Sequence, residues 1–213
     1  MYTIGIIDDK EGERADIQVS ILENVSNVEE FAFKEYDLEH REKEELFQEI
    51  IADITEEKIQ TLIVDYKLDT AQNVIKGWEI VDFVHGKVPE FPVVILTNVP
   101  DESRESEYID ADKVYPKIIF LDTAHEETTR MVENILLNIQ RYVKRRKDLE
   151  GNLVRALEKL DQNSTDEGII KDVLKIEDEL GKYKESDQTY LDRKVNLSEV
   201  KDILQELKEI DIH

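Results

Sequence analysis

The chain has 213 residues, enough for one good hydrophobic core with an appendage or for two small domains. Its 28 Lys and Arg stand against 51 Asp and Glu, a formal net charge of -23. This acidity argues against a broad nucleic-acid or anionic-membrane surface, because phosphate binding needs clustered Lys and Arg. With no Cys, the chain has no disulfides or thiolate metal sites.

The start of the chain favours a cytoplasmic protein. Residues 2–7 already form an apolar β-branched run with no basic leader before them, and no apolar run approaches the roughly 20 residues of a membrane span. The histidines lack metal-ligand spacing, so we expect surface positions and no zinc site. They are His40, His85, His125 and His213.

Short apolar runs alternate with segments of helical periodicity up to about residue 122. Strands are expected at 2–7, 30–36, 61–65, 92–98 and 113–117, and helices at 12–25, 38–54 and from Trp78 onwards, with a loop at 66–74 and a short helix within 100–111. Most of the strand runs are apolar throughout, which is typical of strands buried on both faces, whereas 30–36 is charged enough for an edge strand. The alternation predicts an α/β fold with a doubly wound five-stranded parallel sheet, in the flavodoxin-like order 2-1-3-4-5.

A last helix opens near Thr123 and continues far beyond the sheet. Its core positions from Val132 to Leu160 are spaced alternately three and four, the heptad pattern of a coiled coil, with Arg146 at one of them. After a break at 162–165, amphipathic helices are expected at 169–180 and from Asn196 to Leu207, with a polar loop between them. We therefore predict a domain of residues 1–140 and a helical stalk with a small all-α module at 141–213. The stalk either pairs with a second copy or folds back on its own chain.

Polar side chains follow four of the predicted strands. Asp8 and Asp9, Asp65, Thr97 and Lys117 all come where a strand ends, and the carboxyl edge of such a sheet is where ligands bind. Converging carboxylates repel one another unless a cation lies among them, and oxygen ligands without His or Cys favour Mg²⁺. A carboxylate held against Mg²⁺ can attack phosphorus, while a hydroxyl and an ammonium neutralise the transferred oxygens.

These segments resemble the receiver domain of two-component response regulators. Ile6-Ile7-Asp8-Asp9, Leu62-Ile63-Val64-Asp65, Val94-Ile95-Leu96-Thr97 and the late Lys117 match its order and approximate spacing over residues 1–140. The resemblance implies Asp65 as the phosphoacceptor, with Thr97 as the switch hydroxyl and Lys117 as the cation that pairs with the phosphoryl group. It implies Mg²⁺ held by Asp8, Asp9, Asp65 and the backbone carbonyl of Lys67.

The resemblance also implies a histidine kinase or another phosphodonor as partner, and no enzymatic activity beyond self-catalysed phosphorylation and dephosphorylation. The sequence departs from the family where Asp69 replaces a Pro, where Asn98 follows the switch hydroxyl, and where Pro116 precedes Lys117. An alternative is therefore a phosphorylation-independent pseudo-receiver that acts as a protein-interaction scaffold. A haloacid-dehalogenase-like phosphatase ranks last, because that family needs a second Asp two residues after the first and Lys10 stands there.

The carboxyl-terminal part indicates protein contacts as the output. Residues 150–213 contain no basic recognition helix, and the cluster at 144–147 is surrounded by acids, so we expect neither nucleic-acid nor membrane binding. We expect a homodimer through the 132–160 helix, or a protein partner of the carboxyl-terminal helices. Histidine phosphotransfer is disfavoured there because the only His is the terminal His213.

Overall fold

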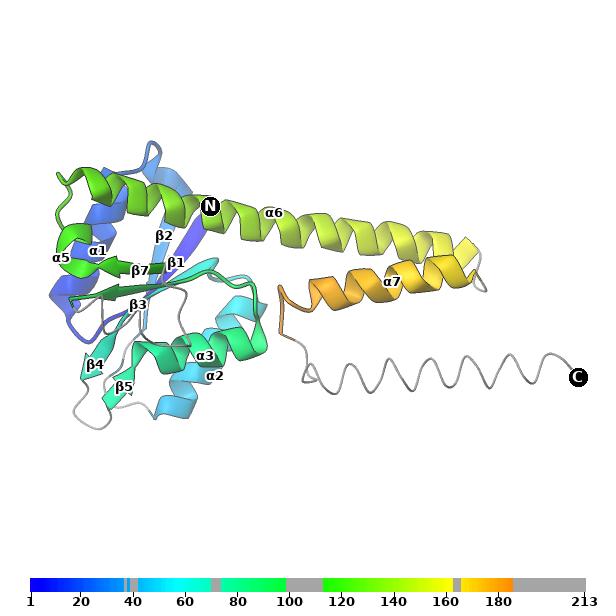
Figure 1. The fold of residues 1–213 in the computed structure, drawn as a ribbon, viewed down its shortest axis with the longest axis horizontal. Helices are drawn as coiled ribbons and strands as arrows, with labels where there is room; N and C mark the ends of the chain where they lie inside the picture. Colours follow the sequence, from blue (N-terminus) through cyan, green and yellow to red (C-terminus); the bar gives the residue numbers. More distant parts are fainter. Residues whose placement is uncertain (37, 39–41, 70–73, 99–112, 163–165, 186–213) are drawn as a thin grey trace, which may run out of the picture.

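A single parallel sheet organises the amino-terminal two thirds of the chain (Figure 1). The computed structural model describes all residues except 37, 39–41, 70–73, 99–112, 163–165 and 186–213. The sheet consists of β1 (Tyr2–Ile7), β2 (Phe31–Glu35), β3 (Thr61–Asp65), β6 (Val93–Thr97) and β7 (Val114–Pro116), in the order β2-β1-β3-β6-β7. Numbered along the chain, these five strands have the order 2-1-3-4-5. The predicted doubly wound sheet is therefore confirmed, and β2 lies at its edge as expected.

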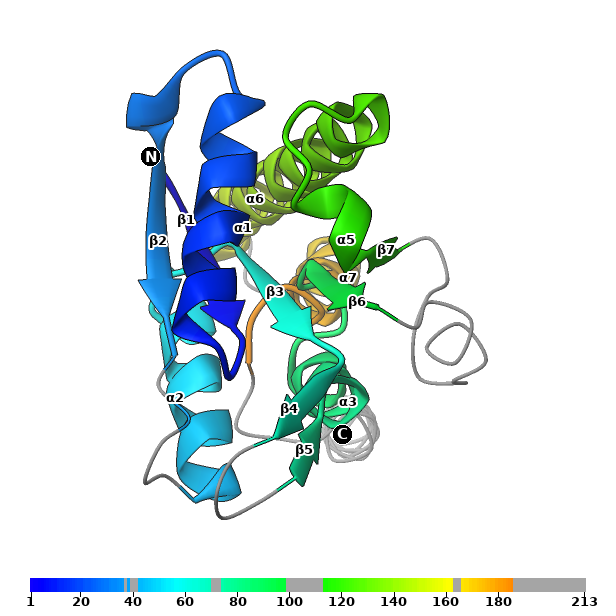
Figure 2. The same ribbon diagram turned by 90° about the vertical axis from the view of Figure 1, so that its left-hand side faces the viewer.

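Helices cover both faces of this sheet (Figure 2). Successive strand residues point to opposite faces, so Leu62 and Val64 of β3 pack in one core cluster while Ile63 packs in the other. The first cluster includes α2 (Lys43–Thr55) and α3 (Gly77–Lys87), and the second includes α1 (Glu11–Glu23) and α6 (Glu126–Gln162). This two-sided burial explains why the strand runs are apolar throughout. In the described part of the chain, no helix has the length and apolar character needed to cross a membrane.

The segment after β3 differs from the prediction. The loop expected at 66–74 is wrong, because β4 (Lys67–Asp69) and β5 (Val74–Lys76) form an antiparallel pair. Leu68 pairs with Ile75, and both side chains are buried. Each strand is only three residues long, too short to show a period of two. The short helix expected within 100–111 lies outside the described residues.

The connection from the last strand to α6 contains a further short helix. β7 ends at Pro116, so Lys117 begins α5 (Lys117–Phe120), which the sequence reasoning missed. The hydroxyl of Thr128, in the first turn of α6, donates hydrogen bonds to the carbonyl oxygens of Ile119 (2.6 Å) and Asp122 (2.8 Å). Thr128 therefore joins α5 and the following turn to α6.

The long helix α6 is continuous for 37 residues, and α7 (Glu167–Leu180) returns antiparallel along its outer half (Figure 1). In the inner half Val132, Ile135 and Ile139 are at most 1% exposed and pack with residues of the sheet. In the outer half, Leu149 and Ala156 are also buried. The stalk therefore folds back on its own chain, and much of the stripe that predicted a coiled coil is buried there. The helix expected from Asn196 lies outside the described residues.

An aromatic cluster fixes the base of this hairpin to the amino edge of the sheet, just before β6. Tyr142 stacks on Tyr183 with ring centroids 5.7 Å apart and meets Phe91 edge-on at 5.4 Å. Its hydroxyl donates to the carbonyl oxygen of Tyr183 at 2.7 Å, and burial raises the pKa of Tyr142 to about 12. One turn further on, Arg146 pairs with Glu57 (2.8 Å) and Glu150 (3.1 Å). Arg146, which lies in the heptad stripe, thus forms ion pairs with carboxylates of its own chain.

The packing of α6 on the sheet predicts unequal effects of truncating two neighbouring side chains. Ile139→Ala removes a fully buried side chain and should lower the free energy of unfolding by roughly 2–5 kcal/mol, measured by urea denaturation. Leu137→Ala, on the same helix but 41% exposed, should change it by less than about 1 kcal/mol. Equal losses in the two variants would contradict the described orientation of α6.

Candidate functional site

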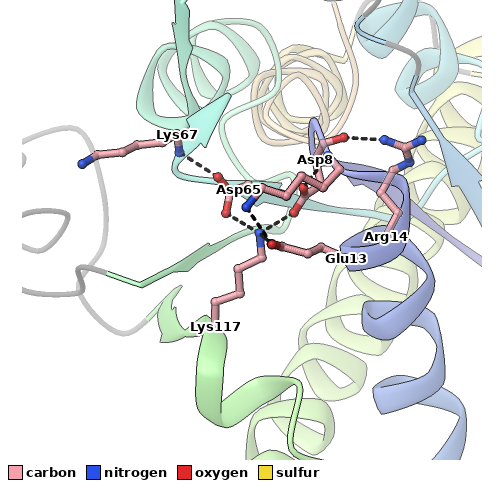
Figure 3. A network of polar contacts seen from close by, with 7 residues as sticks. Asp8, Glu13, Arg14, Asp65, Lys67 and Lys117 are labelled. Carbon is pink, nitrogen blue, oxygen red and sulfur yellow. Dashed lines mark hydrogen bonds and ion pairs between the residues drawn. The ribbon is translucent and has the colours of Figure 1, made fainter. Parts of the chain in front are cut away.

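Three carboxylates converge on the ammonium group of Lys117 at the carboxyl edge of the sheet (Figure 3). Lys117 Nζ lies 2.5 Å from Asp8 Oδ2 and 2.7 Å from Asp65 Oδ1, and it also pairs with Glu13. Asp8 follows β1, Asp65 ends β3 and Lys117 follows β7, so the parallel strands deliver these groups to one point. All three are at most 9% exposed. The structure therefore brings together Asp8, Asp65 and Lys117 as the sequence predicted.

The backbone fixes the orientation of the two aspartates. Asp8 Oδ1 accepts a hydrogen bond from the amide of Lys10 at 3.0 Å, and Asp65 Oδ2 accepts one from the amide of Lys67 at 2.9 Å. The Asp8 carbonyl oxygen also accepts a hydrogen bond from Arg14 at 2.7 Å. The side chain of Lys67 points away from the cluster (Figure 3). Each aspartate thus has one oxygen held by the backbone and the other directed at Lys117.

The charges in this cluster do not balance. Burial disfavours the charged form of Lys117, but its hydrogen bonds with Asp65, Asp8 and Glu13 outweigh burial and raise its pKa. Burial raises the pKa of Asp65, and Lys117 offsets only part of that rise. For Glu13, burial is outweighed by hydrogen bonds from Lys10 and Lys117, which lower its pKa. One ammonium among three carboxylates leaves negative charge that a divalent cation can compensate.

The donor set suits Mg²⁺, but it differs from the predicted one. One carboxylate oxygen from each of Asp8, Glu13 and Asp65 lies within 4.8 Å of the others. These are hard oxygen donors, which Mg²⁺ prefers. Asp9 is not part of this group; its pKa is raised by burial and by the neighbouring Asp8. Asp9 and the carbonyl of Lys67 as metal ligands stay predictions.

Glu13 is the site residue that sequence reasoning missed. It lies in the first turn of α1, directly after the loop that carries Asp8. Acids are common in the first turn of a helix because they interact favourably with its dipole, so the sequence alone gave no reason to assign Glu13 to the cluster. Only the packing of α1 against the carboxyl edge brings its carboxylate to Lys117.

An open pocket of about 510 Å³ adjoins Lys117. Thr97, at the end of β6 and 2% exposed, lines it together with Glu13 and Lys117, as do Asn98 and Pro116. Thr97 is thus brought to the predicted place. Tyr115 is buried in the core cluster that contains α1 and α6.

Gly77 allows a close approach to the end of β3. A Cβ atom at this position would lie 2.5 Å from the backbone oxygen of Asp65, closer than packed atoms come. The amide of Gly77 also donates to the carbonyl of Tyr66 at 2.9 Å. The inserted β4–β5 hairpin therefore returns to the end of β3 through a position that suits only glycine.

Comparison with known proteins finds a match among solved structures. No protein-family model and no curated protein sequence matches this chain. Among solved structures, the chain is similar to a response regulator receiver domain from Rhodospirillum rubrum, with 19% sequence identity and a TM-score of 0.39. The match covers 66% of this chain and 94% of that one. The strand order and the helices on both faces are those of the flavodoxin-like doubly wound fold that the sequence predicted.

The ion-pair cluster predicts a large stability loss when its cation is removed. Lys117→Met leaves buried carboxylates unpaired and should lower the free energy of unfolding without divalent cations by roughly 3–5 kcal/mol, measured by urea denaturation. Adding Asp8→Asn to this variant should recover part of the loss. The control is Lys10→Met, whose side chain is 62% exposed and pairs with Glu13 at 2.7 Å, and which should cost less than about 1 kcal/mol. A loss in Lys10→Met as large as in Lys117→Met would contradict the central place of Lys117.

Proposed function

We propose that this chain is a signalling protein in which Asp65 accepts a phosphoryl group and the helical hairpin carries the output. The observation that supports this is the cluster of the buried Asp8 and Asp65 and the partly exposed Glu13 around Lys117, beside an open pocket lined by Thr97. A nucleophilic carboxylate, an ammonium and a hydroxyl are the groups that phosphoryl transfer to an acid side chain requires.

In the proposed reaction an Asp65 carboxylate oxygen attacks phosphorus, and the bond to the donor breaks with its electron pair leaving on the donor. The product is an acyl phosphate, which water later hydrolyses. Lys117 and Thr97 would pair with the phosphoryl oxygens as they gain negative charge. Asp8, Glu13 and Asp65 would hold Mg²⁺, which would supply further positive charge there. The donor would be a histidine kinase or a small acyl phosphate. The protein itself would have no enzymatic activity beyond its own phosphorylation and dephosphorylation.

The proposed relay runs from Lys117 to α6. Lys117 is the first residue of α5, and Thr128 hydrogen-bonds α5 and the next turn to the start of α6. If Lys117 moves from the carboxylates to a phosphoryl group, α5 must adjust with it, and Thr128 passes this shift to the helix that forms half of the hairpin. The output would be a protein contact of the carboxyl-terminal helices. A homodimer would use a face other than the buried heptad positions.

The assignment of Asp65 predicts a covalent adduct. Incubation with acetyl phosphate and Mg²⁺ should give a phosphoryl adduct on the wild-type chain and none on Asp65→Asn, measured by intact-protein mass spectrometry. Asp82→Asn, an exposed position on α3 with the same change of charge, should form the adduct as the wild type does. A folded wild-type chain that forms no adduct and binds no beryllofluoride would favour the phosphorylation-independent scaffold.

The carboxylate cluster predicts which acidic side chain contributes more to the affinity for Mg²⁺. Glu13→Gln should weaken Mg²⁺ binding on the order of tenfold, because it removes a charged oxygen donor from the group around Lys117. Asp9→Asn should weaken it less, because Asp9 lies outside that group. Isothermal titration calorimetry on both variants measures the difference. The reverse ranking would support the ligand set predicted from sequence.

A further inference from the structure

The two sides of the α6–α7 hairpin differ in chemistry. One side is a groove of about 430 Å³. Its lining includes the charged and polar side chains of Arg145, Asn152, Arg155 and Lys159 from α6 and of Asp172, Lys175 and Glu179 from α7, together with the apolar Leu149, Ala156, Ile169 and Ile176. The charged and polar side chains can remain hydrated on this side.

The other side carries apolar residues with nothing packed over them in the described part of the chain. Val154 and Leu157 of α6 are 56% and 45% exposed, and they lie three residues apart on one side of the helix. On α7, Ile170 and Leu174 are only partly buried and lie four residues apart. On α7 the buried Val173 lies between these positions and the groove in the helical repeat, and on α6 the buried Ala156 lines the groove itself. We call Val154, Leu157, Ile170 and Leu174 the apolar hairpin face.

We propose that the chain's own residues 196–210 cover the apolar hairpin face as a third helix, antiparallel to α7. Their sequence has the pattern such a helix requires, since apolar residues recur at intervals of three and four on one side, and Asn196 and Glu199 have capping-box-like spacing. The apolar positions are Leu197, Val200, Ile203, Leu204, Leu207 and Ile210. This proposal does not depend on phosphorylation of Asp65.

The position and length of the segment match the face. The described chain ends at the base of the hairpin, where the carbonyl of Lys182 accepts from the amide of Glu90 at 3.0 Å and Glu185 pairs with Lys87 at 3.5 Å. Residues 186–195 then supply a connection long enough for an antiparallel turn, which needs about 2–8 residues. A helix over 196–210 would be about 22 Å long and α7 is about 21 Å, from the rise of about 1.5 Å per residue.

Charge and tethering favour this occupant over a second copy of the chain. With the segment antiparallel to α7 and its apolar residues inward, the right-handed helix places Lys201 and Lys208 on the flank nearer α7. Asp178 of α7 lies on that flank, and Glu177 lies on the side of α7 that carries Ile170 and Leu174. A short tether also gives the segment an effective concentration on the order of millimolar, which a second copy would have to match in solution.

Engineered cysteines in the 213-residue chain test the proposal. The sequence contains no Cys, so only the engineered thiols can react. Leu157→Cys combined with Val200→Cys, Leu204→Cys or Leu207→Cys samples three registers of the third helix. Under mild oxidation at least one pair should form an intramolecular disulfide about tenfold faster than the matched pair with Arg155→Cys, which lies in the charged groove. Non-reducing electrophoresis separates cross-linked monomer from dimer. Disulfides mainly between chains, or equal rates at 155 and 157, would overturn the proposal.

A second measurement covers the case in which the paired cysteines weaken docking. Leu157→Cys alone should react slowly with a soluble maleimide, and the added Leu204→Asp should make it react about as fast as Arg155→Cys, because a charge cannot dock on an apolar face. Arg155→Cys itself should be insensitive to Leu204→Asp. A reaction at Leu157→Cys that is already fast and unchanged by Leu204→Asp would overturn the proposal.

Discussion

The ion pairs of Lys117 constrain the rest of the structure. This buried ammonium meets Asp8 and Asp65 across 109 and 52 residues of sequence. Buried charges are tolerated only when they are paired with good geometry, so β1, β3 and β7 must end at the same level of the sheet. The parallel order meets this requirement, since every strand runs toward the same edge. The negative charge left over after pairing is what a divalent cation can compensate at this cluster.

The sequence predicts those parts of the fold that have a regular pattern of apolar residues. Runs such as Leu62–Val64 are apolar on both faces, and an Asp at the end of such a run must lie at the carboxyl edge, so Asp8, Asp65, Thr97 and Lys117 could be placed in advance. Glu13 could not, because its contact depends on how α1 packs and first-turn acids are common. The β4–β5 pair could not be predicted because each strand is only three residues long, and a segment of that length shows no period of two.

The long helix shows why periodicity does not identify a partner. Heptad spacing indicates an apolar stripe along a helix, and the same stripe serves for packing on a sheet, on another helix of the chain or on a second chain. Here Ile135 and Ile139 use it against the sheet, Ala156 in the outer half is buried in the hairpin, and Arg146 is neutralised by Glu57 and Glu150. The fold-back of α7 was one of two outcomes that the sequence allowed, and tertiary contacts decided it.

These arrangements give α6 two attachments at opposite edges of the sheet. Near its start, Thr128 hydrogen-bonds α5, which begins with Lys117 of the carboxyl-edge site. Halfway along, Tyr142 is held by Phe91 and Tyr183 at the amino edge. Between these two points the inner half of α6 also packs on the sheet through Ile135 and Ile139. In the proposed relay, a shift of Lys117 would therefore have to move α6 together with this packing, and the aromatic cluster marks the point beyond which the hairpin leaves the sheet.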